Sequence, residues 1–134
     1  MRVCVFCRIT NEKAAAFRVY EDESTVGFLD IHPFTLGHTL VCCKSHFENI
    51  REMPDELVEK LFVAVKRVAQ KVRSGMIADG INYLINEGTA ANQIVPHVHV
   101  HIIPRKHGDQ VSYRQRLTVQ ENDLRAVADR ISNS

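Results

Sequence analysis

The sequence predicts an α+β fold, an antiparallel sheet of about five strands with one long central helix and a C-terminal helix. Short strand-like segments fill the first third of the chain, and two segments of helical periodicity follow. Strands and helices do not alternate strictly, as a parallel sheet built from βαβ units would require. A chain of 134 residues can bury a real core, so we expect a single domain over residues 1–134.

The strands are predicted from short apolar runs bounded by turns. Five segments are expected: residues 17–20, 26–29, 39–43, 81–86 and 98–103. The first two flank the acidic turn EDES and read as a hairpin. The last two alternate apolar and polar residues, which is typical of a strand with one buried face.

Residues 54–73 form the clearest predicted helix. Pro54 suits the first helical position, and Asp55 and Glu56 place negative charge where the helix dipole favours it. Gly75 is a natural stop for this helix. Its apolar face is formed by Leu57, Leu61, Val65, Val68 and Val72.

A second helix is expected to begin at Thr118, because the spacing from Thr118 to Glu121 fits a capping box. Its buried side would comprise Leu124, Val127, Ala128 and Ile131.

Charge and hydropathy exclude some classes of function. A formal net charge of +1 is too small to attract a polyanion strongly, so no nucleic-acid partner is expected. No apolar run approaches the ~20 residues that span a bilayer, so no membrane partner is expected. The N-terminus, MRVCVFCRIT, is too short in its apolar part and too soon charged for a signal peptide, which favours a cytoplasmic location.

The histidines indicate chemistry, because all but His107 lie within residues 31–101. On a strand, side chains two residues apart share a face, so His97, His99 and His101 would project together. Such a row is either a polar surface stripe, a metal site or a nucleophilic centre. Metal binding and catalysis are weighted equally, and each outweighs the polar stripe, because solvent-facing strands usually carry Lys, Glu and Thr.

The cysteines come as Cys4 and Cys7, then Cys42 and Cys43. A C-x-x-C pair indicates metal binding, or a redox motif where it opens a helix. The residues after Cys7 show no amphipathic period, which weakens the redox interpretation. Cys42 and Cys43 would point to opposite faces of a strand, so at least one packs in the core.

The segment HVHVHII resembles the signature of the histidine triad (HIT) superfamily. The resemblance covers nearly the whole chain, since CVFCRI, YEDEST, GFLDIHP, GHTLVCCKSH and NEG occur in the family's order and spacing. It implies a HIT-type sheet. It also implies a hydrolase that attacks the α-phosphorus of a nucleotide through a covalent nucleotidyl-histidine and releases a nucleoside monophosphate. The alternative is a non-catalytic nucleotide-binding or adaptor protein with the same fold.

The resemblance also implies roles for individual residues. His99 would be the nucleophile, His101 would contact the phosphate oxygens, and Asn86 would face the phosphate or leaving group. The loop from Gly88 to Gln93 would bring backbone N–H groups to the phosphates.

The nucleoside would bind at the GFLDIHP segment, with Asp30 accepting hydrogen bonds from the ribose of a purine nucleotide. Phe6, Ile9, Phe28 and Ile31 would sandwich the base, although residues of these types on short strands usually belong to the core.

Zinc-bearing members of the family further imply a structural zinc ion held by Cys4, Cys7, His46 and His97. No cofactor would be required for catalysis, and the family is usually a symmetric homodimer.

Two features distinguish this chain from many members. Ile94 stands where a Ser or Thr hydroxyl commonly meets the leaving group, and there is no tryptophan. GHTLVC, PDELVEKLF and IIPRKHGD resemble the branch that hydrolyses dinucleoside polyphosphates, whereas CVFC and NEG are shared with the phosphoramidase-like branch. Both substrate classes therefore stay open.

Overall fold

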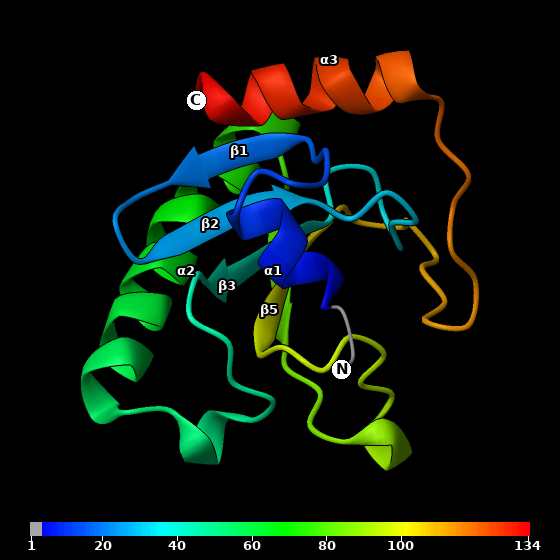
Figure 1. Ribbon diagram of the computed structural model, residues 1–134. Helices are drawn as coiled ribbons and strands as arrows, with labels where there is room; N and C mark the ends of the chain where they lie inside the picture. The colour runs from blue at the N-terminus through cyan, green and yellow to red at the C-terminus, as the bar shows by residue number, and fades with distance from the viewer. Residues whose placement is uncertain (1–3) are drawn as a thin grey trace.

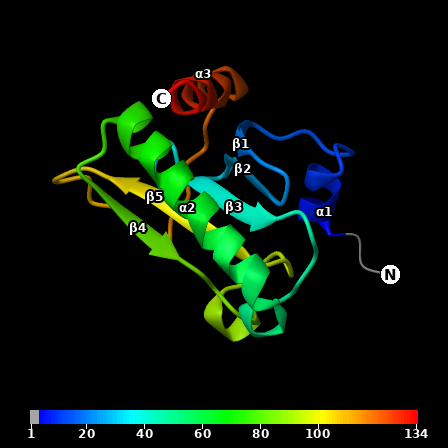
Figure 2. The same cartoon turned by 90° about the vertical axis from the view of Figure 1, so that its left-hand side faces the viewer.

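A computed structural model describes residues 4–134 of the chain. Its strands are β1 (Arg18–Glu21), β2 (Thr25–Leu29), β3 (Thr39–Cys43), β4 (Gly80–Leu84) and β5 (His99–Arg105). They form one sheet in the order β1-β2-β3-β5-β4, and every neighbouring pair is antiparallel. Figure 1 labels β1, β2, β3 and β5, and Figure 2 shows β4 beside β5. The predicted α+β class, with its five-stranded antiparallel sheet, is confirmed.

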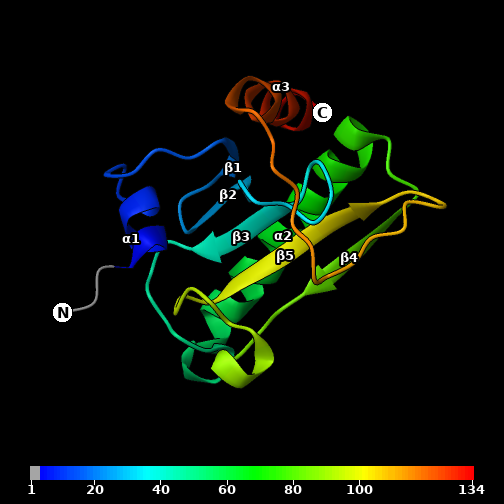
Figure 3. The same cartoon turned by 90° about the vertical axis from the view of Figure 1, so that its right-hand side faces the viewer.

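Helices cover the sheet unequally. The long helix α2 (Asp55–Met76) crosses one face (Figure 2), and α3 (Glu121–Ser132) packs against α2 and β1. The short helix α1 (Val5–Thr10) lies on the opposite side, near the end of β3. Residues 106–120, here called the crossing segment, run back over the face of the sheet that α2 leaves open (Figure 3). Single 3₁₀ turns occur at Ile50–Glu52 and Thr89–Ala91.

Two apolar clusters lie on the two faces of the sheet. The main core joins α2 and α3 to the sheet and includes Val41, Val100 and Ile102. The smaller cluster, beneath α1, is formed by Phe6, Ile9, Val26, Phe28, Leu40 and Cys42. Cys42 and Cys43 are buried in different clusters, which confirms that adjacent strand residues separate to opposite faces.

Several predicted boundaries are wrong. Gly75 does not stop α2, which continues to Met76 and ends where Ile77 adopts the left-handed conformation at φ 51°. The predicted capping box at Thr118 is also wrong, because α3 begins at Glu121. The residue before it, Gln120, makes no capping hydrogen bond with its side chain. The helix α1 was not predicted, and none of the helices within residues 4–134 is long and apolar enough to cross a membrane.

Candidate functional site

Strand β5 and the residues before it place the three triad histidines on one face of the sheet. Val98, Val100 and Ile102 point into the main core, so the alternate side chains face the open side. The histidines are nevertheless buried, with exposures of 1% for His97, 7% for His99 and 5% for His101. A solvent-facing polar stripe is therefore excluded.

His99 is held by the backbone of its own strand. Its Nδ1 lies 2.7 Å from the carbonyl oxygen of His97, so Nδ1–H donates and Nε2 keeps a free lone pair. Burial lowers the pKa of His99 below its ordinary value, which keeps the ring neutral at physiological pH. A neutral imidazole with an open Nε2 is the form that can attack phosphorus.

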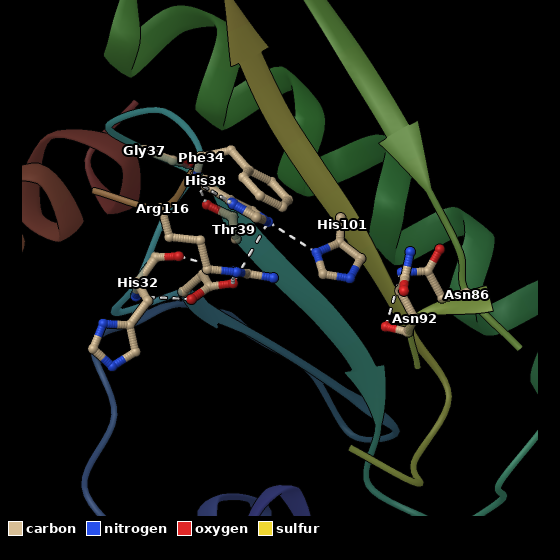
Figure 4. A network of polar contacts seen from close by, with 10 residues as sticks. His32, Phe34, Gly37, His38, Thr39, Asn86, Asn92, His101 and Arg116 are labelled. Atoms are coloured by element: carbon tan, nitrogen blue, oxygen red, sulfur yellow. Dashed lines mark hydrogen bonds and ion pairs between the residues drawn. The ribbon is translucent and has the colours of Figure 1, made fainter. Parts of the chain in front are cut away.

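His101 is oriented by a second buried histidine, His38. The Phe34 N–H donates to His38 Nδ1 at 3.1 Å, so the His38 proton resides on Nε2 and is donated to His101 Nδ1 at 2.9 Å (Figure 4). Burial lowers the pKa of His38 to about 4 and that of His101 to about 3, so neither ring is charged at neutral pH. The relay leaves the proton of His101 on Nε2, available to a ligand.

Asp30 lies beside this relay at the end of β2. One carboxylate oxygen accepts from the His32 N–H at 2.9 Å, and the other accepts from Arg116 Nη1 at 2.9 Å (Figure 4). The same oxygen is 3.7 Å from His38 Nε2, but burial outweighs this attraction and the His38 ring stays neutral. Arg116, from the crossing segment, therefore neutralises the carboxylate across the open face.

A cavity of about 570 Å³ opens between α1, β2 and β5. It brings together most of the residues predicted for catalysis and nucleotide binding: Phe6, Ile9, Phe28, Asp30, Ile31, His99 and His101. Phe6 packs edge-on against both Phe28 and His99, at centroid distances of 5.3 and 4.9 Å. The cavity is a mainly apolar slot, and its lining also includes the ion pair of Asp30 and Arg116 and the triad histidines His99 and His101.

A second cavity, of about 900 Å³, lies on the other side of His101. Asn86 and Gln93 line it, so the structure separates them from the apolar slot. The Asn86 amide donates to the carbonyl of Asn92 at 3.4 Å. Gly88, at φ 83°, is not among the residues that line either cavity, and its N–H donates to Gln93 Oε1 at 2.7 Å. Gly88 and Gln93 thus brace the loop.

Cys4, Cys7, His46 and His97 form a third constellation, with their ligand atoms all within 4.8 Å of one another. The two sulfurs approach His97 Nδ1 at 3.5 and 3.6 Å, and Cys7 Sγ and His97 Nδ1 both lie 3.3 Å from His46 Nδ1. A tetrahedral zinc site with Zn–S of about 2.3 Å and Zn–N of about 2.0–2.1 Å has S–N edges of about 3.5 Å and N–N edges of about 3.3 Å. The donor set and its spacing therefore fit zinc.

The tautomer of His97 agrees with this fit. Its Nε2–H donates to the Cys43 carbonyl at 2.8 Å, which leaves the Nδ1 lone pair facing the thiols. Burial and the neighbouring Cys4 raise the pKa of the Cys7 thiol to about 11. A bound metal ion would lower this pKa, because it coordinates the thiolate form.

A family model described as the HIT domain matches residues 11–108. The chain belongs to the HIT family. A zinc-bound histidine triad family protein from Mycobacterium smegmatis is 43% identical, with a TM-score of 0.84 over 97% of this chain and 94% of that one. A hypothetical histidine triad nucleotide-binding protein from Sulfolobus tokodaii is 36% identical, with a TM-score of 0.90 over 97% and 90%. The adenylylsulfatase HINT3 of Arabidopsis thaliana is 35% identical over 79% of this chain and 54% of its own length.

Sequence reasoning on this HIT protein missed two residues of the site. His38 was visible as the histidine of GHTLVC at the start of β3, but no local pattern links it to a strand distant in sequence. Arg116 lies in a segment without regular structure, and only the folded path of the crossing segment brings it to Asp30.

Proposed function

We propose that this HIT protein is a nucleotide hydrolase or nucleotidyl transferase that acts on nucleoside phosphoramidates or dinucleoside polyphosphates. The open Nε2 of neutral His99, fixed by the backbone in the lining of a mainly apolar slot, is the observation that carries the proposal. The relative from Arabidopsis, by its name an adenylylsulfatase, supports chemistry at an adenylyl group.

The reaction would proceed in two displacements. His99 Nε2 forms a bond to the α-phosphorus while the bond to the leaving group breaks, giving a nucleotidyl-histidine. Water then attacks the phosphorus, the P–N bond breaks, and the nucleoside monophosphate is released. The Nε2–H of His101 donates to a phosphate oxygen throughout and stabilises the charge of the transition state. Asn86 would meet the phosphate or leaving group from the second cavity.

The nucleoside would occupy the apolar slot. Phe6, Ile9, Phe28 and Ile31 supply apolar surface for a purine base. Each oxygen of the Asp30 carboxylate keeps a lone pair beyond its bond to His32 or Arg116, so it can still accept from a ribose hydroxyl. Gly88 and Gln93 would shape the phosphate-facing loop rather than bind directly, because they are hydrogen-bonded to each other.

Zinc would complete the cluster of Cys4, Cys7, His46 and His97. Four protein ligands leave no open position, so the metal would be structural and would supply cross-linking rather than chemistry. The zinc-bound relative from M. smegmatis supports this assignment.

A homodimer is proposed from the exposed surface around β4. This strand is an edge of the sheet, and Tyr83 on it is 56% exposed, while Phe62 and Val63 of α2 are 42% and 48% exposed. A symmetric pairing would cover such apolar surface. Light scattering should give the dimer mass for the wild type and the monomer mass for Tyr83→Arg, with Ile77→Arg as the control. A monomeric wild type would remove the proposal.

The decisive experiment compares wild type with His99→Ala on adenosine phosphoramidate and on diadenosine tetraphosphate. We expect wild-type turnover of at least one substrate and a loss of about 10³-fold or more in the variant, since the nucleophile is gone. Undiminished turnover by His99→Ala would refute the mechanism. Tight AMP binding by a wild type that turns over neither substrate would favour a nucleotide-binding protein instead.

A further inference from the structure

The second cavity has a one-sided charge. Two arginines of the crossing segment, Arg114 and Arg116, line it, and no aspartate or glutamate is among its lining residues. The remaining polar groups include the amides of Asn82, Asn86 and Gln93. Arg116 is paired with Asp30 of the apolar slot, whereas Arg114 forms no ion pair within residues 4–134, so a positive charge without a local carboxylate favours an anionic occupant.

The cavity adjoins the reacting centre. His101, Arg116, Asn92 and Ile94 line both this cavity and the apolar slot, so these four residues mark the junction between the two. With the nucleoside in the slot and its α-phosphate at His99, the group beyond the phosphate would extend past His101 into the second cavity. Ile94, at the junction, is apolar and 79% exposed, so it offers the leaving group no hydrogen bond.

Arg116 retains donors for such a group. Nη1 donates to Asp30 Oδ2 at 2.9 Å and to the His32 carbonyl at 2.8 Å, and these are the hydrogen bonds that the guanidinium makes within residues 4–134. The Arg116 guanidinium also makes a cation–π contact with Phe34, whose ring centroid lies 4.3 Å from Cζ. The other guanidinium N–H groups are free for an anion at the junction.

The crossing segment is anchored on both sides of its two arginines. Tyr113 donates its hydroxyl proton to Asn82 Oδ1 at 2.7 Å, and the Leu117 N–H donates to the Pro33 carbonyl at 2.7 Å. At its start, Arg105 Nε–H and Nη2–H donate to the two carboxylate oxygens of Asp109, at 2.8 and 2.7 Å. The backbone that carries both arginines is thus anchored before any ligand arrives, and the Arg116 guanidinium is already oriented by Asp30, His32 and Phe34, which reduces the cost of ordering it.

We infer that Arg114 and Arg116 make the second cavity a subsite for an anionic leaving group, a phosphate chain or a sulfate, rather than an amine. The inference rests on the proposed function for the location of the reacting phosphorus. The two arginines set specificity: they bind the negative charge that the leaving group carries after the bond to phosphorus breaks, and they add nothing for ammonia or an amine.

The kinetic test uses three substrates that share one adenylyl group: diadenosine tetraphosphate, adenosine 5′-phosphosulfate and adenosine phosphoramidate. Arg114→Gln and Arg116→Gln are each compared with Lys106→Gln, which removes one exposed positive charge outside both cavities. The readout is kcat/KM for each anionic-leaving-group substrate divided by kcat/KM for the phosphoramidate. This ratio cancels any general loss, including the loss of the Arg116 contact with Asp30.

We expect the ratio to fall about tenfold in each arginine variant and to stay at the wild-type value in Lys106→Gln, since a charge-assisted hydrogen bond to an anion is lost. A fall confined to the tetraphosphate assigns the subsite to phosphate chains, and a fall confined to the phosphosulfate assigns it to sulfate. An unchanged ratio, or an equal fall in Lys106→Gln, overturns the inference.

A binding measurement separates this inference from the proposed chemistry. Inorganic tripolyphosphate should bind the wild type in calorimetry and should bind Arg114→Gln about tenfold more weakly, while AMP affinity reports on the nucleoside slot. This result needs no turnover, so it stands if the role of His99 fails. Tripolyphosphate binding that is absent in the wild type, or equal in the variant, overturns the subsite while leaving the His99 mechanism intact.

Discussion

The three triad histidines differ chiefly in the group that their second ring nitrogen meets. One backbone carbonyl accepts a hydrogen bond from Nδ1–H of His99, another accepts one from Nε2–H of His97, and His38 Nε2–H donates to Nδ1 of His101. One residue type thereby yields an open Nε2, an open Nδ1 and a donating Nε2–H within five consecutive residues at β5. The differentiation comes from partners around the strand, not from the histidines themselves.

His38 should make stability depend on pH. Burial lowers its pKa to about 4 in the folded state, against the ordinary 6.5, and the groups facing it are Asp30, His99, His101 and Arg116. Above pH 6.5 neither state is protonated and the effect is nil. Between 6.5 and about 4 only the unfolded chain gains the proton, so stability falls as the solution is acidified, and the loss levels off below 4.

Urea unfolding with chelator present, from pH 7.5 to 4.5, measures this effect. At pH 5 the free energy of unfolding of His38→Gln should change with pH less steeply than that of the wild type, by up to about 1.4 kcal/mol per pH unit. Equal slopes in the two proteins would contradict the assignment of a lowered pKa to His38.

At the scale of elements, Gly75 is tied to the contact between α2 and α3. Alanine is favoured over glycine inside a helix by about 1 kcal/mol. A Cβ at position 75, however, would lie 2.9 Å from both the Arg130 carbonyl oxygen and the Ile131 Cα, which are backbone atoms of α3. Because backbone cannot rotate away, Gly75→Ala should push the helices apart at a cost of about 1–3 kcal/mol.

Gly75→Ala should therefore unfold at lower denaturant concentration than the wild type, with a net loss of up to about 2 kcal/mol once the gain in helix propensity is subtracted. Gly80→Ala is the matched control, since a Cβ there meets nothing within 4 Å and should change stability little. A Gly75→Ala protein more stable than the wild type would show that helix propensity outweighs the packing cost.

These elements also show what the sequence can predict. Helical periodicity placed α2 because that helix buries one face, and apolar runs between turns placed the strands. The expected strand at 39–43 coincides with β3, whose residues are all buried. Gly75 looked like a stop because glycine has two uses, a helix end and a close helix contact, which only the neighbouring α3 distinguishes. The helix α1 was not predicted because its six residues, which overlap the C-x-x-C motif, are too few to show a helical period.

Of the candidate site, the residues on strands and α1 were predicted together, and the cavity between α1, β2 and β5 contains them. Arg116 and the separation of Asn86 and Gln93 into a second cavity were not predicted. Both depend on how connections without regular structure pass over the sheet, and local sequence pattern carries no signal for such paths.

For the molecule as a whole, the proposed zinc ion would join the N-terminal segment to the body of the protein. Cys4 and Cys7 belong to this segment, whereas His46 follows β3 and His97 precedes β5. Cys7→Ser should lose the metal and lower Tm, because the free energy of binding adds to that of folding. Nucleotide chemistry should remain recognisable, since the metal would take no part in it.

Metal analysis and thermal unfolding check this expectation, with the exposed His107→Ala as the control outside the cluster. One zinc per chain in purified Cys7→Ser, or a metal-free wild type, would contradict it.

The short helix α1 also has a thermodynamic consequence. Cys4 and Cys7 belong to the proposed zinc cluster, while Phe6 and Ile9 line the apolar slot proposed to bind the nucleoside. A zinc ion that fixes α1 would already order Phe6 and Ile9 before nucleotide binds. Binding would then cost less conformational entropy, so nucleotide would bind more tightly to the zinc-bound protein. Linkage makes the effect reciprocal: nucleotide must raise the affinity for zinc by the same factor. When zinc is scarce, protein without bound nucleotide would then lose its zinc first, and protein with bound nucleotide would retain it.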